Sequence, residues 1–155
     1  NSYKRLLPGQ ISGYWKNWGH DHRCATVRVN PERDASTRLE NRMPDGAASS
    51  YSAIAAVLTA SRLGVEASLP CPDPETGDAL ETASTEEHTP EHLGAAIEAL
   101  RTDKKFTDAI GPEMVDQYLA IKDAEWAKYL AANGSWNETI GRFTEWEEQT
   151  YLPYL

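Results

Sequence analysis

Hydrophobic and polar positions along the chain predict a β-rich opening part followed by a mainly helical C-terminal half. The run Cys24–Val29 is rich in residues that favour strands, and Thr37–Met43 alternates charged with uncharged side chains. The short polar stretch between them, Asn30–Ser36, favours a hairpin over a crossover connection. The pattern therefore predicts an antiparallel strand pair. It is preceded at Gln10–His22 by a glycine- and aromatic-rich loop without a clean period.

The next part of the chain predicts one helix and one long loop. Ala47–Leu63 is small and apolar with its large side chains at helical spacing, and Gly64 is a natural residue to end that helix. The following stretch, Glu66–His88, has three prolines and six acidic residues between Asp73 and Glu87. This composition predicts a long solvated loop.

Two proline-containing motifs mark further helix starts. Thr89-Pro90-Glu91 offers a capping hydroxyl, a first-turn proline and an acid, and Gly111-Pro112-Glu113 has proline at the same position. The second of these helices is expected to end at Asn133-Gly134, and a final short helix is expected near Trp146. Together with the strand pair, these helices predict the α+β fold class. The expected apolar faces are Leu93, Ala96, Ile97 and Leu100 on one helix, and Val115, Leu119, Trp126 and Leu130 on the next.

Composition limits the partners of the chain. Its 155 residues suffice for about one domain, 40% of them are hydrophobic, and the formal net charge is −9. This acidic balance argues against nucleic acid and anionic membranes as partners, and no apolar run approaches the roughly 20 residues of a membrane span. Two cysteines, Cys24 and Cys71, make a poor disulfide framework and fit a reducing cytoplasm, which is the expected location.

The stretch Thr37–Tyr51 is the first candidate for chemistry. In a strand, Arg38, Glu40 and Arg42 would line one face because side chains alternate. A carboxylate between two guanidiniums suits a site that holds a metal ion together with several anionic oxygens. Taken alone, the same pattern also fits a surface strand with a ladder of salt bridges.

Three motifs, in this order, resemble motifs of the glutamine synthetase family. The stretch RLENRMPDGAASSYSAIAAVLTASRLGV is similar to that family's R-x-E-x-R-x-P-D motif and the alanine-rich helix after it. The opening NSYKRLLPG resembles the family's N-S-Y-K-R-L-x-P-G, and DHRCATVRV resembles its N-R-x-x-x-x-R strand. Their shared order and compatible spacing make the resemblance specific.

This resemblance reaches only the last part of the family's catalytic domain. The family's N-terminal β-grasp-like domain, its earlier metal-binding glutamates and its metal-binding histidine have no counterpart in the sequence. Residues 1–155 are therefore expected to be the C-terminal portion of a glutamine synthetase-like catalytic domain, a fragment that is inactive by itself. By the same resemblance, the full-length protein is expected to be a homo-oligomer of stacked rings.

The resemblance implies an ATP-dependent ligation in two steps. ATP phosphorylates the γ-carboxylate of glutamate, and an amine then displaces phosphate from γ-glutamyl phosphate, with Mg²⁺ or Mn²⁺ as the cofactor. The resemblance implies that Glu40 is a metal ligand and that Arg23 and Arg42 act in catalysis. It also implies a glutamate-binding set, Arg5, Arg23 and Arg42, and an ATP-binding set, Arg23, Arg28 and Arg38.

One departure from the family pattern bears on the substrate. Ammonia-using members carry a glutamate two residues past the glycine that Gly9 matches, and this chain has Ile11 there. Isoleucine cannot accept a proton from ammonium, and the aromatic residues Tyr14, Trp15 and Trp18 follow closely. We therefore predict a γ-glutamyl-amine ligase that couples glutamate to an organic amine, with these four side chains in the flap and amine pocket.

Other interpretations remain open at this stage. The protein could be an ammonia-using glutamine synthetase whose flap acid comes from elsewhere, or a non-catalytic assembly or binding domain. The aromatic residues could simply pack under a loop. His20 and His22 alternate with Asp21 and could be metal ligands, but a site normally needs three or more ligands and no third is evident nearby. His88 and His92 are expected to be polar residues at a helix start.

Overall fold

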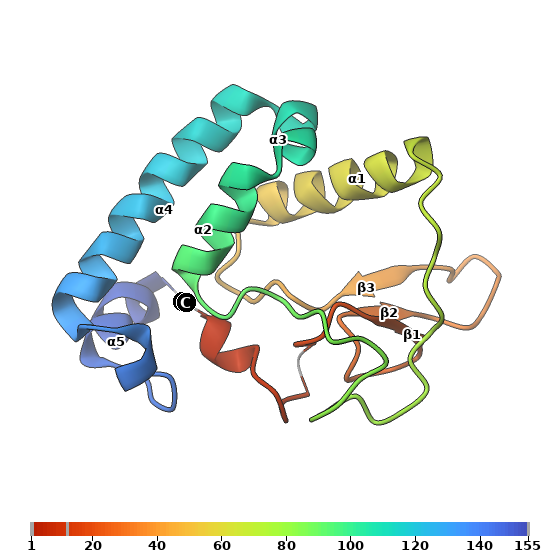
Figure 1. Cartoon of the computed structure of the whole chain (residues 1–155), viewed down its shortest axis with the longest axis horizontal. Coiled ribbons are helices and arrows are strands. Elements are labelled where there is room, and N and C mark those ends of the chain that lie inside the picture. The colour runs from red at the N-terminus through yellow and green to blue at the C-terminus, as the bar shows by residue number, and fades with distance from the viewer. Residues whose placement is uncertain (1, 12, 155) are drawn as a thin grey trace. The chain divides into compact units, whose positions relative to one another are not determined.

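The computed structural model of the chain describes residues 2–11 and 13–154 (Figure 1). These residues form three short strands and five α-helices, which confirms the α+β class. The chain divides into two compact units. We call residues 2–45 and 70–89 the strand unit, and residues 46–69 and 90–154 the helical unit. None of the helices in the described residues is long and apolar enough to cross a membrane.

The strand unit contains a three-stranded sheet in the order β1 (Trp18–His20), β2 (Val27–Val29) and β3 (Leu39–Asn41). Strands β2 and β3 are antiparallel, as predicted, although both are shorter than the sequence pattern suggested. Strand β1 lies parallel to β2 within the stretch expected to be a loop, so that prediction is wrong for these three residues. Its sequence Trp-Gly-His carries no alternation that would reveal a strand.

Segment 70–89, which belongs to the strand unit, packs against residues near the N-terminus of that unit and is not simply a solvated loop. Its backbone is tied to the N-terminal residues by hydrogen bonds from Glu75 N to Trp18 O (2.7 Å), Lys16 N to Glu87 O (2.9 Å) and Thr89 N to Tyr14 O (2.8 Å). Glu75, Ala79 and Thr89 are buried. Most of the segment is exposed and has no helix or strand, as predicted for a solvated loop, and these buried residues are the exception. In Figure 1 this segment runs past the three strands without regular structure of its own.

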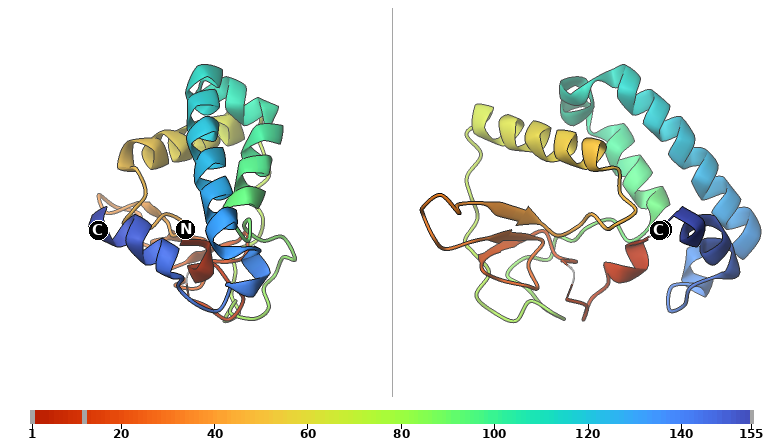
Figure 2. Two further views of the ribbon diagram at one scale, coloured as in Figure 1. Left: turned by 90° about the vertical axis from the view of Figure 1, so that its left-hand side faces the viewer. Right: turned by 180° about the vertical axis from the view of Figure 1, so that it is seen from behind.

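The helical unit consists of α1 (Ser50–Glu66), α2 (Leu93–Thr102), α3 (Lys104–Ile110), α4 (Pro112–Asn133) and α5 (Glu145–Tyr151). Helices α2 and α4 lie side by side, as both views of Figure 2 show, and α3 joins them and contacts α1. Three 3₁₀ turns complete the described elements: Ser2–Arg5 in the strand unit, and Trp136–Glu138 and Leu152–Tyr154 in the helical unit.

The predicted helix boundaries are confirmed at some positions and wrong at others. Pro112 is at the start of α4 and Gly134 caps its end, as expected. Helix α1 continues past Gly64 and ends at Glu66, so the predicted terminator is wrong. Helix α2 begins at Leu93 instead of beside the Thr89-Pro90-Glu91 motif, because the His92 ring accepts a hydrogen bond from Ala95 N (3.1 Å) and acts as the N-cap.

An aromatic stack connects the start of α2 to α4 in the helical unit, beside the buried residues Leu93, Ile97, Val115, Leu119 and Trp136. The Trp126 indole lies between the rings of His92 and Tyr129, with centroid distances of 5.1 and 5.3 Å. Gly94 faces this indole, and a Cβ there would lie 2.6 Å from Trp126 Nε1, so only glycine fits without a shift. The predicted α4 face is wrong at its end, because Leu130 is 38% exposed and Tyr129, one residue earlier, is 1% exposed.

Candidate functional site

Glu40 forms the centre of an ion-pair cluster on the sheet of the strand unit. It pairs across the strands with Arg28 in the antiparallel register. Its Oε2 accepts from Arg28 Nη1 at 3.3 Å, and its Oε1 accepts from Arg42 Nη1 at 2.6 Å. The carboxylate is therefore held between two guanidiniums, as the sequence pattern predicted, but one of them comes from the neighbouring strand.

Arg38 does not join this cluster through a hydrogen bond to Glu40. Its Nη1 donates to the backbone carbonyl of Ser36 at 2.9 Å, and the residue is exposed. Of the expected set of Arg38, Glu40 and Arg42, the last two are hydrogen-bonded to each other, and Arg28 of β2 supplies the second guanidinium at Glu40. Sequence alternation on a single strand could not reveal Arg28 as the partner, since the pairing depends on the register between β2 and β3.

Asp21 is a member of the cluster that the sequence reasoning missed. Its carboxylate accepts hydrogen bonds from both Nε and Nη2 of Arg28. This hydrogen-bonded contact with Arg28 lowers the pKa of Asp21 below its usual value, and the charges of Arg23 and Arg38 act in the same direction. Asp21 has a positive φ of 48° at the end of β1, a backbone conformation that aspartate tolerates better than most residues.

Arg42 connects the cluster to the flap and to Arg5. Its Nη2 donates to the backbone carbonyl of Ile11 at 3.2 Å, and its buried Nε has no hydrogen-bond partner among the described residues. The Arg5 guanidinium donates to the carbonyl of Met43, the next residue, at 2.6 Å. Arg5 and Arg42, both predicted to bind glutamate, are therefore brought together through the chain at residues 42 and 43.

Positive charge exceeds negative charge among the named residues of the site. The side chains of Arg28 and Arg42 are mostly buried, so their charges are screened by water less than those of freely exposed arginines. Arg23 is exposed, and its charge contributes to the lowered pKa of Asp21. The arginine cluster, defined as Arg23, Arg28, Arg38 and Arg42, thus has four positive charges against the two carboxylates Asp21 and Glu40.

The described residues do not by themselves fit a divalent metal ion. Both oxygens of Glu40 accept from guanidiniums, and the described residues contain no group of three or more His, Cys, Asp or Glu side chains able to hold a metal. His22 uses both ring nitrogens, with Nε2 at 2.6 Å from Gly77 O and Nδ1 accepting from Cys24 N. His20 packs edge-on against Trp18.

The aromatic residues of the expected amine pocket contact segment 70–89. Tyr14 is buried and stacks on His88 with a centroid distance of 4.9 Å. Because α2 begins at Leu93 with His92 as its N-cap, the helix-start prediction is confirmed for His92 and wrong for His88. Trp15 Nε1 donates to Leu80 O at 3.3 Å, and Trp18 Nε1 donates to Pro72 O at 2.8 Å.

Ile11 differs from these three aromatic residues. Its side chain is 60% exposed, while its carbonyl accepts from Arg42. It is therefore the exposed member of the predicted set, and its backbone is hydrogen-bonded to the arginine cluster.

Comparisons with known proteins agree with the three motifs. The family described as "Glutamine synthetase, catalytic domain" matches residues 1–140. Proteins named glutamine synthetase are similar over almost the whole chain: 32% identity over 160 residues in Methanocaldococcus jannaschii, covering 99% of this chain, and 33% over 158 residues in Staphylococcus epidermidis, covering 98%. A third, from Halobacterium salinarum, is 32% identical over 163 residues and also covers 98% of this chain.

The alignments also show what fraction of each relative's length this chain covers. It spans 33%, about a third, of the length of each of these three relatives. The matched part includes all the residues of the arginine cluster and both of its carboxylates, since the family match begins at residue 1 and ends at residue 140. On this evidence, the chain belongs to the glutamine synthetase catalytic-domain family.

Proposed function

We propose that this chain is the C-terminal portion of the catalytic domain of an ATP-dependent carboxylate–amine ligase. The whole protein would form γ-glutamyl phosphate from glutamate and ATP and couple it to an organic amine. Membership of the glutamine synthetase family supports the ligase class. The single observation that carries the proposal is the arginine cluster, whose mostly buried Arg28 and Arg42 have their charges next to Glu40.

The arginine cluster suits a reaction that brings two anions together. Joining a carboxylate to a phosphoryl group needs positive charge fixed in advance near the transferred group. Glu40 orients Arg28 and Arg42, because it accepts one hydrogen bond from each. The Nε of Arg42 is buried and has no hydrogen-bond partner among the described residues, so the charge of this guanidinium is only partly compensated by protein groups. We assign Arg23, Arg28 and Arg38 to the nucleotide, and Arg5, Arg23 and Arg42 to glutamate, with Arg23 and Arg42 acting in catalysis.

A divalent cation would need ligands from outside this chain. The family resemblance predicts Mg²⁺ or Mn²⁺ with Glu40 as one ligand, and one carboxylate already paired with two guanidiniums is insufficient for such an ion. The chemistry that the metal supplies when bound is charge neutralisation at the phosphates. The contribution of this chain is the positive charge of its arginines and the orientation imposed by Glu40.

Ile11 supports an organic amine as the acceptor. Its exposed apolar side chain is two residues past Gly9, and its carbonyl is fixed by Arg42. An apolar group at this point gives no charge to attract ammonium and no base to deprotonate it, whereas it can contact the carbon skeleton of a larger amine. We therefore propose a γ-glutamylamide as the product, with Ile11 at the acceptor side of the site.

The names of the relatives favour a second candidate. The similar proteins from Methanocaldococcus jannaschii and Staphylococcus epidermidis are both named glutamine synthetase, which supports ammonia as the alternative acceptor. In that case the acid that binds ammonium would come from a residue other than Ile11. The two candidates differ in one measurable property, which is the preferred amine.

The deciding experiment measures the acceptor specificity of the whole protein that contains this chain. Phosphate release with glutamate and ATP would be followed with ammonia and with a panel of aliphatic and aromatic amines. We expect at least one organic amine to have a kcat/KM about tenfold or more above that of ammonia. A preference for ammonia over every amine in the panel would show that the amine assignment is wrong.

Substitutions at Ile11 make this test specific. Ile11→Glu should increase kcat/KM for ammonia by about tenfold and decrease it for the preferred amine, because it supplies a negative charge at an exposed position. Ile11→Gln is the matched control, since glutamine has nearly the same shape as glutamate but no charge. Equal effects of the two substitutions would contradict a role for charge at this position.

The size of the relatives supports the proposal that residues 1–155 are part of a larger domain. An exposed apolar stripe on α1, formed by Tyr51, Ile54, Leu58 and Val65, supports it independently. These positions lie within about 60° of one another around the helix, at the spacing of a buried face. We propose that other parts of the whole protein cover this stripe, and that the protein assembles into the stacked rings predicted from the family resemblance.

A further inference from the structure

Segment 70–89 holds a buried carboxylate that the proposed chemistry does not use. Glu75 is only 7% exposed, although it comes from a segment of acidic and proline-rich sequence. Its Oε1 accepts from the backbone N–H groups of Thr76 and Gly77, both at 3.1 Å. Its Oε2 accepts from Ser84 N at 2.8 Å, from Ser84 Oγ at 3.0 Å and from Asn17 Nδ2 at 3.2 Å. A buried charge with five donors is well compensated.

A continuous chain of hydrogen bonds leads from this carboxylate to Arg42. Asn17, held by Glu75 through Nδ2, uses its Oδ1 to accept from Thr26 N at 3.1 Å. The carbonyl of the same Thr26 accepts from Arg42 N at 2.9 Å. Asn17 and Thr26 are both buried. The orientation of the Arg42 backbone therefore depends on a buried polar network whose other end is in segment 70–89.

The network also fixes strand β1. The backbone N–H of Glu75 donates to Trp18 O at 2.7 Å, and Trp18 is the first residue of β1. The Thr26 hydroxyl donates to the carbonyl of Trp15. Gly13 makes the close packing at Thr26 possible, because a Cβ at residue 13 would lie 2.8 Å from Thr26 Cα. Segment 70–89 thus helps to position Thr26, whose carbonyl accepts the hydrogen bond from Arg42 N.

We propose that Glu75 is a positioning residue for Arg42, acting through Asn17 and Thr26 and never touching the substrate. This inference rests on the proposed function only for the role of Arg42 in binding an anion. Neutralising Glu75 leaves its five donors without a charged acceptor and weakens the contact that orients Asn17. The expected consequence is a looser Thr26–Arg42 hydrogen bond and a weaker anion site, with the sheet otherwise retained.

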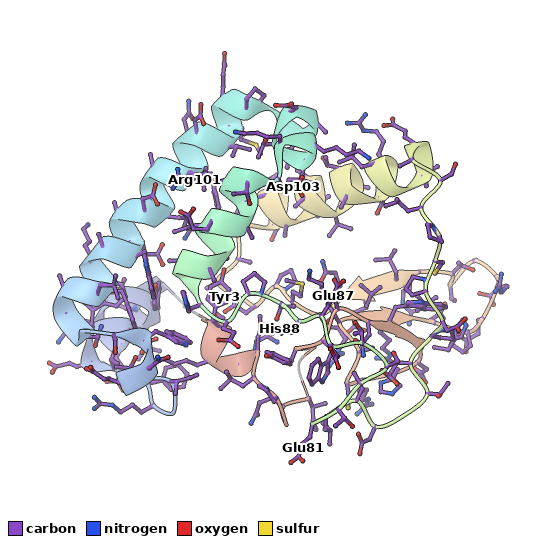
Figure 3. The ribbon with its side chains drawn as sticks, viewed as in Figure 1. Tyr3, Glu81, Glu87, His88, Arg101 and Asp103 are labelled. Atoms are coloured by element: carbon purple, nitrogen blue, oxygen red, sulfur yellow. The ribbon has the colours of Figure 1, made fainter. Side chains whose placement is uncertain are left out.

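The same segment provides a matched control. Glu87 pairs with Lys16 at 3.3 Å, and both side chains are exposed. This ion pair also joins segment 70–89 to the stretch before β1, but neither of its two side chains is hydrogen-bonded to Asn17, Thr26 or Arg42 among the described residues. Figure 3 labels Glu87 and its neighbour His88 on this segment. Glu87→Gln therefore removes a carboxylate from the same segment without disturbing the buried network.

The first test measures amide hydrogen exchange in the 155-residue chain and does not require catalysis. Glu75→Gln should increase the exchange rates of the Thr26 and Arg42 amides by about tenfold relative to the Leu119 amide in α4, which reports on the helical unit. Glu87→Gln should leave all three unchanged. Unchanged exchange of Thr26 and Arg42 in a folded Glu75→Gln chain would overturn the proposal. If Glu75→Gln does not fold, Ser84→Ala, which removes one donor, decides: it should accelerate both amides severalfold, and no change refutes the proposal.

The second test measures anion binding at Arg42. Inorganic phosphate is titrated while the Nε–Hε NMR signals of Arg28 and Arg42 are followed. Glu75→Gln should weaken phosphate binding about fivefold or more, with no change for Glu87→Gln. Equal affinity in wild type and Glu75→Gln would overturn the positioning role. Absence of phosphate binding in the wild-type chain would instead count against the proposed function, and the exchange result would still decide the role of Glu75.

Discussion

Arg42 is joined to four other residues through its own side chain and peptide groups. Its guanidinium contacts Glu40 and the carbonyl of Ile11, while its backbone N–H donates to Thr26. Its carbonyl lies 3.4 Å from Arg5 Nη1. A residue held through both its backbone and its side chain loses little further freedom when it binds a ligand, which is the condition for effective electrostatic stabilisation. At the scale of single residues, the site is therefore defined by hydrogen bonds between segments far apart in sequence.

The acid stability of the strand unit is predicted to depend on Glu75. The backbone N–H of Ser84, together with the donors at Gly77 and Asn17, lowers the pKa of Glu75 from 4.5 to about 2, against the opposing effect of burial. Because the folded-state pKa lies below the unfolded value, this stabilisation is complete above about pH 4.5 and is lost as the pH falls toward 2. The loss is on the order of 3 kcal/mol.

Urea unfolding of wild type and Glu75→Gln at several pH values measures this contribution. The difference between their free energies of unfolding should be largest at pH 6 and should shrink between pH 4.5 and pH 2, since groups common to both proteins cancel. Glu87→Gln, which changes an exposed acid, should show no comparable pH dependence. A constant difference between wild type and Glu75→Gln over this range would contradict the assigned linkage.

At the scale of elements, local sequence signals mark both ends of α4, whereas packing contributes to the start of α2. The proline at the start of α4 and the glycine at its end were visible in the sequence and are confirmed. The N-cap of α2 is a histidine, whose ring nitrogen replaces the hydroxyl or carboxylate usually expected. The same His92 ring stacks on Trp126, so the cap and the aromatic core share one side chain. Such a dual role follows from packing and leaves no local sequence signal.

Two glycines in helices predict opposite effects of alanine. Gly94→Ala in α2 would place a Cβ 2.6 Å from Trp126 Nε1, and the indole is confined between two rings. We expect a loss of about 1–3 kcal/mol in the free energy of unfolding, despite the better helix propensity of alanine. Gly64→Ala in α1, where nothing lies within 4 Å of the added Cβ, should gain about 0.5–1 kcal/mol. Urea denaturation measures both, and a stabilising Gly94→Ala would contradict the close stacking.

At the scale of the whole molecule, the stripe of apolar side chains on α1 is the feature that most needs a partner. Its four members are exposed in a chain that covers a third of its relatives' length. Leaving such a stripe in water costs roughly 1.5–3 kcal/mol per large side chain compared with burial. The helical unit and the strand unit each have their own buried residues, so the stripe is not needed for either core.

The coverage of this stripe predicts a difference between the 155-residue chain and the whole protein. Leu58→Glu should change the stability of the chain by less than about 0.5 kcal/mol, but should lower that of the whole protein by about 2 kcal/mol or more, because it buries a charge there. Ala60→Glu, on the opposite side of α1 and also exposed, serves as the control. Equal effects of Leu58→Glu in the two proteins would be evidence against the larger domain.

The same preparation of the chain alone should show no ligase turnover, and measurable turnover would refute that expectation.

The sequence by itself determined the fold class, the β2–β3 pairing, the approximate extents of α1 and α4, and the family. These features rest on periodic patterns and short motifs, which act over a few neighbouring residues. Strand β1 has no such pattern, and it was revealed only by its parallel pairing with β2 and its hydrogen bond to Glu75. The burial of Glu75 likewise could not be read from an acidic, proline-rich stretch, because its donors come from residues 17, 76, 77 and 84.

The tertiary structure alone decided which arginines meet which acids. The sequence supplied Glu40 and Arg42 on one strand, but the register with β2 brought Arg28 to Glu40, and the end of β1 brought Asp21 to Arg28. Ion pairs form between charged side chains regardless of their separation in sequence. The partner of each charged side chain is therefore determined by the backbone positions of the residues. The sequence therefore determined which residue types are present in the site, and the tertiary structure determined which of them are in contact.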